Sequence, residues 1–200
     1  MKNIKKILIG THNIGKFREI SYLLNKNIKK ISPVSIKIKS PKETGKTFSE
    51  NAKLKAEYFC KKSKLLSISD DSGLSVNCLD GKPGIYSARM AKKCGSFNKA
   101  MHKIIQQVSY KNKNKKIKNM RADFICSLSI KYPAGKSLTV VGKIKGKISE
   151  RLKGKNGFGY DPIFIPNNKK ITFGQMKKSE KIKMDHRYLA FQKLKKKIKI

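Results

Sequence analysis

The sequence of 200 residues contains no tryptophan, four cysteines, and 12 acidic residues against 49 lysines and arginines. The cysteines are Cys60, Cys78, Cys94 and Cys126. They form no C-x-x-C pair and have no histidine at metal-ligand spacing, which argues against a zinc site and against a disulfide framework. No apolar run approaches the length of a membrane span, and the first residues lack the apolar stretch of a signal peptide. We therefore expect a cytoplasmic protein with reduced thiols and no membrane partner.

Arginine is also scarce, because only five arginines stand among the 49 basic residues and lysines are spread over every segment. Nucleic-acid-binding proteins tend to use arginine for bidentate contacts and to concentrate their charge on one face. A uniform excess of lysine, isoleucine and asparagine is instead what an AT-rich coding bias produces. We expect no specific nucleic-acid binding from the net charge of +37, and a lysine-rich nucleic-acid-binding module remains the competing interpretation.

The chain has no internal repeat and no Pro/Ser-rich linker, so residues 1–200 are predicted to form a single domain with a substantial core. Apolar runs predict short strands, and apolar residues at spacings of three and four predict amphipathic helices. Thr47 and Glu50 form a capping box that opens one of these helices. The expected strands cover 5–9, 34–38, 65–68, 122–132, 138–148 and 163–165, and the expected helices begin near residues 17, 48, 97 and 186.

Two adjacent carboxylates, Asp70 and Asp71, follow the apolar run Leu65–Ile68 and precede Gly73, where we expect a tight turn. Side chains alternate along a strand, so the two carboxylates should point to different sides and only one need face a cleft. A carboxylate at a strand end suits the binding of a divalent metal or the activation of a water. The same pattern is also compatible with a turn cap at Asp70 and a solvated Asp71.

The segment from Gly10 to Lys16 joins a strand to a helix through a glycine-containing turn. Such a turn offers backbone N–H groups and the positive end of a helix to a phosphate, although a plain strand–helix connection would look the same. Gly10, Gly15 and Lys16 match most of a Walker A pattern, but Phe17 stands where a serine or threonine would hold Mg²⁺. The mismatch argues against a P-loop NTPase.

Three further segments carry candidate binding groups. Glu43 lies in a loop before the predicted helix, where its carboxylate is free to reach a metal. The loop 154–162 contains three glycines around Phe158 and Tyr160, and suits stacking of a nucleobase, unless its aromatic rings fold back onto the core. Asp185 is a plausible helix N-cap, which would leave His186 and Arg187 at the positive helix end with donors aimed outward.

Taken together, five phrases of the chain resemble one family, the inosine/xanthosine triphosphate pyrophosphatases, also called non-canonical purine NTP pyrophosphatases or Ham1-like proteins. The phrases occur in the family's order and spacing and cover nearly the whole chain. They are T-H-N-I-G-K (11–16) with Glu19, E-T-G-K-T-F-S-E-N-A (43–52), S-D-D-S-G-L with L-D-G-K-P-G-I-Y-S-A-R (69–89), G-F-G-Y-D-P-I-F (157–164) and E-K-x-x-x-D-H-R (180–187).

The resemblance implies an α/β fold with an elongated, mixed, twisted β-sheet flanked by helices and two lobes around a central cleft. It implies Mg²⁺-dependent hydrolysis of ITP, dITP and XTP to the monophosphate and pyrophosphate, in a protein that is usually a homodimer. A pyrophosphatase for other modified bases is the nearest alternative. The family's tail usually has serine where Asp185 stands here, and a negative charge there could raise the pKa of His186.

The resemblance also implies roles for individual residues. Asp71 would be the general base and a Mg²⁺ ligand, Glu43 would share the metal, and Ser72 would contact the substrate. The residues expected around the triphosphate are Thr11, His12, Asn13, Ile14, Gly15 and Lys16, and those expected to recognise the base are Phe158, Gly159, Tyr160, Asp161, Lys181, His186 and Arg187.

Overall fold

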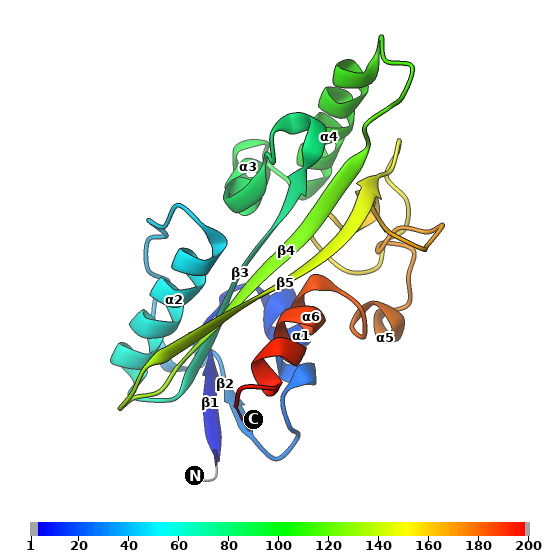
Figure 1. The fold of residues 1–200 in the computed structure, drawn as a ribbon. Helices are drawn as coiled ribbons and strands as arrows, with labels where there is room; N and C mark the ends of the chain where they lie inside the picture. Colours follow the sequence, from blue (N-terminus) through cyan, green and yellow to red (C-terminus); the bar gives the residue numbers. More distant parts are fainter. Residues whose placement is uncertain (1–3, 199–200) are drawn as a thin grey trace. The chain divides into compact units, whose positions relative to one another are not determined.

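The computed structural model describes residues 4–198 and contains one mixed sheet of six strands in the order β2-β1-β3-β4-β5-β6 (Figure 1). β1 pairs in parallel with β2 and with β3, whereas β5 and β6 are antiparallel. The strands are β1 (Lys6–Ile9), β2 (Lys29–Ile31), β3 (Ser67–Val76), β4 (Arg121–Lys131), β5 (Ser137–Ile148) and β6 (Phe164–Pro166). The predicted mixed α/β class is therefore confirmed.

Six α-helices accompany the sheet in the described part of the chain. They are α1 (Ile14–Leu23), α2 (Phe48–Ser63), α3 (Ser87–Lys93), α4 (Phe97–Asn112), α5 (Lys178–Lys181) and α6 (His186–Lys195). The predicted capping box opens α2, where the Thr47 side chain accepts a hydrogen bond from the Glu50 N–H and Glu50 Oε2 accepts one from the Lys46 N–H. Local sequence thus determines where this helix begins.

The chain divides into two compact units, each with its own core. The first unit covers residues 4–71, 126–142 and 187–198, and its core packs β1, β3 and β4 against helices α1 and α6, which lie side by side in Figure 1. The second unit covers 72–125 and 143–186, and its core combines α4 with β3, β4 and β6 residues. Three strands, β3, β4 and β5, continue from one unit into the other along the chain.

Three sequence expectations about local structure were wrong. Residues 34–38 form no strand, because Pro33 begins the 3₁₀ turn Val34–Ile36 and Lys37, at φ 55°, ends it. Gly73 makes no turn, since β3 continues through it to Val76 with both faces largely buried. The two glycines and the proline of segment 79–89 lead one to expect continuous loop, but the segment contains the 3₁₀ turn Gly84–Tyr86 and the start of α3.

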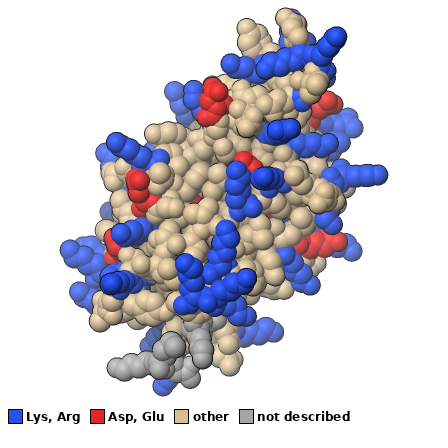
Figure 2. Space-filling model, in the orientation of Figure 1, with Lys and Arg blue, Asp and Glu red and all other residues tan. Residues whose placement is uncertain are grey.

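Basic side chains are distributed widely over the face of the molecule shown in Figure 2, in separate groups with acidic side chains among them. This agrees with the even spread of lysines along the sequence. In residues 4–198, no helix is long and apolar enough to cross a membrane.

Candidate active site

The turn between β1 and α1 has the strand–turn–helix geometry that the sequence predicts. Asn13 caps α1, because its side-chain Oδ1 accepts a hydrogen bond of 3.0 Å from the Lys16 N–H, and the Asn13 N–H donates to Thr11 Oγ1 at 3.2 Å. His12, Asn13 and Ile14 are exposed. The turn therefore leaves the positive end of a ten-residue helix open to solvent, which suits an anionic ligand.

Gly10 is required where β1 enters this turn. A Cβ at this position would collide with the side chains of Ser69 on β3 and Phe59 on α2. The turn can thus lie close to β3, and the ammonium of Lys16 reaches Asp70 Oδ2 at 3.1 Å. On the exposed side of the turn, His12 Nδ1 lies 2.6 Å from Ser40 Oγ.

Asp70 and Asp71 contact different sets of side chains, as strand alternation predicts. Asp70 is buried and accepts from Lys16 and from Arg187 Nη2, each at 3.1 Å. Asp71 accepts instead from Asn51 Nδ2 at 3.2 Å and from Lys55 Nζ at 3.3 Å, both on α2. The two adjacent carboxylates therefore belong to separate clusters within the first unit.

The Asp71 cluster brings a second carboxylate to the same ammonium. Lys55 Nζ lies 2.5 Å from Glu43 Oε1 as well as 3.3 Å from Asp71 Oδ1, so one cation bridges two carboxylates. Burial raises the pKa of Asp71 above its ordinary value, although the ammonium groups of Lys55 and Lys16 oppose the shift. Burial alone would lower the pKa of Lys55, but Asp71, Asp70 and Glu43 together raise it.

This arrangement fits a Mg²⁺ ion. Glu43 and Asp71 come from different segments but converge on a single cation, and carboxylate oxygens are the ligands that Mg²⁺ prefers. Within residues 4–198 no group of three or more His, Cys, Asp or Glu side chains forms a ready-made metal site. Two carboxylates are nevertheless sufficient, because protein-bound Mg²⁺ commonly completes its coordination with waters and substrate phosphates.

The Asp70 cluster is a buried ion network of four side chains from three elements. Arg187 on α6 donates through Nη1 to Glu19 on α1 and through Nη2 to Asp70 on β3, and Lys16 on α1 also contacts Asp70. Arg187 is 1% exposed and Glu19 is 6% exposed. The network joins the turn that carries Lys16 to the strand that carries Asp71, so it fixes the position of both.

In the second unit, Asp161 closes the glycine-containing loop. Its Oδ2 accepts from the Phe158 N–H and from Lys181 Nζ, both at 2.8 Å. Gly157 permits this closure, because it has φ +74° and a Cβ there would collide with the Asp161 carboxylate. The Lys181 ammonium lies 5.0 Å from the centre of the Phe158 ring and 3.9 Å from Asp185 Oδ2.

Comparison with known proteins places the chain in a family. The model of the Ham1 family matches residues 7–197. The chain belongs to the Ham1 family. A dITP/XTP pyrophosphatase from Caulobacter vibrioides is 39% identical over 190 residues, which cover 95% of this chain and 96% of that protein.

Solved structures agree with this assignment. A HAM1 protein from Coxiella burnetii superimposes with a TM-score of 0.84 at 30% identity, covering 96% of each chain. The Ham1 protein of Staphylococcus aureus gives a TM-score of 0.79 at 36% identity, covering 96% of this chain and 97% of that one. The mixed sheet with flanking helices that the sequence phrases imply is therefore confirmed for this Ham1-family chain.

Two polar residues of this Ham1-family chain were missed by sequence reasoning, namely Asn51 and Lys55. Both are buried, on the side of α2 that also carries Ala52, Ala56 and Phe59. A lysine and an asparagine four residues apart on the buried face of an amphipathic helix are unusual, because burying a charge is costly unless it is paired. A lysine on the buried face of the predicted helix could therefore have indicated that a buried carboxylate pairs with it.

The structure contradicts the expected outward orientation of two predicted base-binding residues. His186 and Arg187 do not aim their donors outward, since both are buried, and the His186 ring stacks on Phe124 at a centroid distance of 4.7 Å. For Tyr160 the structure shows the alternative in which the aromatic ring folds back onto the core. Its ring packs in the second core, its hydroxyl donates to the Ser87 carbonyl at 2.8 Å, and burial raises its pKa.

The remaining predicted residues differ in their burial. Phe158, Gly159 and Ser72 are half-buried, and Ser72 follows Asp71 directly on β3. Lys181 and Asp161 are buried with each other as ion-pair partners. Binding of the base by residues of the 158–161 loop, and contact of Ser72 with substrate, stay predictions.

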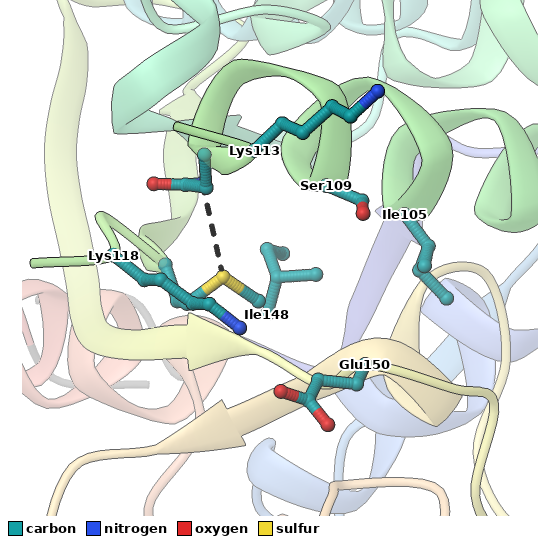
Figure 3. Close-up of a pocket in the computed structure, with 8 residues that line it drawn as sticks. Ile105, Ser109, Lys113, Lys118, Ile148 and Glu150 are labelled. Atoms are coloured by element: carbon teal, nitrogen blue, oxygen red, sulfur yellow. Dashed lines mark hydrogen bonds between the residues drawn. The ribbon is translucent and has the colours of Figure 1, made fainter. Parts of the chain in front are cut away.

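A hollow elsewhere in the second unit has a volume of about 370 Å³ (Figure 3). Its lining includes Ile105, Ser109, Lys113, Lys118, Ile148 and Glu150, and Figure 3 shows Lys113 and Glu150 on opposite sides of it. None of the predicted site residues is among those that line it. The hollow therefore has no part in the chemistry proposed below.

Proposed function

We propose that this Ham1-family chain hydrolyses the non-standard purine nucleoside triphosphates ITP, dITP and XTP to the monophosphate and pyrophosphate. Such a reaction removes these nucleotides from the pool and prevents their incorporation into DNA and RNA. The proposal is supported by relatives named dITP/XTP pyrophosphatases that match nearly the whole chain. The structural observation that carries it is the convergence of Glu43 and Asp71 on one cation position in the first unit.

The Mg²⁺ in this proposal is held by Glu43 and Asp71, and when bound it neutralises phosphate charge that would otherwise repel an attacking water. The carboxylate of Asp71 accepts the proton of that water. The water oxygen bonds to phosphorus, the α–β P–O–P linkage breaks, and pyrophosphate leaves. Lys16 and the N-terminus of α1 hold the phosphate oxygens, so no covalent bond to the protein is needed.

The family resemblance implies cleavage between the α and β phosphates, and the incomplete Walker pattern argues against a P-loop NTPase. Phe17 stands at the position where a P-loop would place a Mg²⁺-binding hydroxyl, and its side chain packs against the core of the first unit. Analysis of the products of ITP with Mg²⁺ should give IMP and pyrophosphate. IDP with orthophosphate would contradict the proposed bond.

Substituting Asp71 tests the proposed base and ligand directly. Asp71→Asn should lower kcat by about a hundredfold or more, because it removes the proton acceptor and one metal ligand while keeping the shape of the side chain. Asp80→Asn is a matched control, since Asp80 is exposed in a turn of the second unit. If both variants retain nearly full kcat on dITP, Asp71 does not perform this chemistry.

For the base, we propose that the half-buried Phe158 ring and Lys181 contact the purine. Lys181 has only donors to offer, which suits the O6 acceptor of hypoxanthine and leaves a donor unpaired against the amino group of adenine. We assign Arg187 to the buried network with Glu19 and Asp70, because both of these carboxylates accept from its guanidinium. Contact between Arg187 and the base stays a prediction of the sequence.

We further propose a cytoplasmic homodimer that binds no nucleic acid specifically. The support for the dimer is the family resemblance, and light scattering of the purified protein tests it. The support for the absence of nucleic-acid binding is the scatter of lysines seen in Figure 2. Any binding to duplex or single-stranded DNA should therefore be weak and should vanish near physiological salt. Tight binding at that salt would contradict the proposal.

A further inference from the structure

The positively charged ammonium of Lys55 lies between the two carboxylates that are proposed to bind the metal. It is 2.5 Å from Glu43 Oε1 and 3.3 Å from Asp71 Oδ1, and these are the two proposed Mg²⁺ ligands. Lys55 is 8% exposed and Asp71 is 5% exposed, so solvent screens their contact little, whereas the Glu43 side chain is 29% exposed and its contact with Lys55 is screened more. Without a cation, two carboxylates this close to one point would repel each other.

A second side chain of α2 holds the carboxylates independently of Lys55. Asn51 is fully buried, and its Nδ2 donates to Asp71 Oδ2 at 3.2 Å while its Oδ1 accepts from the Gly45 N–H at 2.8 Å. Its amide therefore links Asp71 to the loop that carries Glu43. If the Lys55 ammonium moves away, this amide still keeps the two ligand-bearing segments together.

We propose that Lys55 is a built-in counter-ion of the metal site. It neutralises Glu43 and Asp71 while no metal is bound, and Mg²⁺ must displace its ammonium in order to bind. This inference rests on the proposed function, which assigns Glu43 and Asp71 as the metal ligands. It adds a competition between a side chain and the metal for the same two carboxylates.

The competition has a consequence for the order of binding. Mg²⁺ bonds to oxygen at about 2.0–2.1 Å, so the metal and the ammonium cannot share the position between the carboxylates. The displaced ammonium has a flexible four-carbon stem and needs another anion, which a triphosphate supplies. Mg²⁺ alone should then bind the free protein weakly, and nucleotide and metal should strengthen each other's binding.

Titration calorimetry of Mg²⁺ into the nucleotide-free protein at about pH 8 tests the competition. Lys55→Met removes the competing cation, so Mg²⁺ should bind about tenfold more tightly or more, as expected for loss of a charge-assisted contact. Lys55→Arg retains the positive charge and should stay as weak as the unmodified protein. Lys53→Met is the matched control, because Lys53 is an exposed residue of the same helix, and its affinity should change by less than about twofold.

Thermal unfolding gives a second readout that also checks folding. Mg²⁺ should raise the Tm of Lys55→Met more than that of the unmodified protein at equal metal concentration, because tighter binding stabilises the folded state more. If Lys55→Met binds Mg²⁺ no more tightly than the unmodified protein, or if Lys53→Met gains as much, Lys55 is no counter-ion of this site. Failure of the proposed function would instead appear as absence of pyrophosphate release from dITP by the unmodified enzyme.

Discussion

Replacing Arg187 with methionine should destabilise this protein strongly. Arg187 is 1% exposed, and its two donors reach carboxylates on two other elements, Glu19 on α1 and Asp70 on β3. The substitution keeps much of the side-chain volume but removes the charge. Lys16 remains beside Asp70, so two buried carboxylates would be left with one cation of the network.

The expected cost follows from that imbalance. Breaking a buried ion pair by removing one partner typically costs about 3–5 kcal/mol, because the remaining charge is desolvated without compensation. For a chain of this size, about 1 kcal/mol shifts the Tm by about 2–4 °C. The Tm should therefore fall by about 6–20 °C. The decrease should be near 6 °C if Lys16 moves toward Glu19 and partly compensates its charge.

Thermal unfolding at neutral pH measures this effect, with Arg18→Met as the matched control. Arg18 precedes Glu19 on α1 and is exposed, so its loss should change the Tm by only about 2 °C. Combining Arg187→Met with Glu19→Gln and Asp70→Asn removes the stranded charges and should recover a large part of the loss. An Arg187→Met variant as stable as Arg18→Met, or a triple variant that recovers nothing, would refute the reasoning.

The remaining prediction concerns pH. Burial raises the pKa of Asp71 in the metal-free protein, so its carboxyl should titrate there at a pH above about 3.9, the ordinary Asp value. Lys55 opposes the upward shift, so in metal-free Lys55→Met the Asp71 carboxyl should titrate at still higher pH, as ¹³C NMR can measure. An Asp71 pKa that is unchanged or lower in Lys55→Met would show that the ammonium does not act on this carboxylate.

Much of the site follows from rules that act over a few residues. Alternation along a strand separates Asp70 from Asp71, the Thr47–Glu50 box begins α2, and Asn13 caps α1 beside Lys16. Each of these features depends on neighbours within four positions of the chain. The sequence alone is therefore sufficient to predict them, together with the family and its mixed α/β fold.

At other positions, packing in the core rather than the local sequence pattern decided the structure. Gly73 favours a turn in isolation, but β3 runs through it because the strand is buried along most of its length. For Tyr160 the sequence left open both a stacking platform and a ring folded onto the core, and the structure shows the second, with the hydroxyl donating to the Ser87 carbonyl. The free energy gained by burying a large aromatic ring outweighs the tendency of a glycine-rich loop to leave its side chains exposed.

The charge partners were decided by the tertiary structure alone. Arg187 meets Asp70 across 117 positions of the sequence and Glu19 across 168, and Lys55 meets Asp71 across 16. The sequence around a lysine or arginine does not identify the carboxylate with which it pairs, because Coulomb attraction depends only on the distance between the charges and on their surroundings. The sequence determines which charges the chain carries, and the packing of α1, α2 and α6 around β3 determines which of them are buried together.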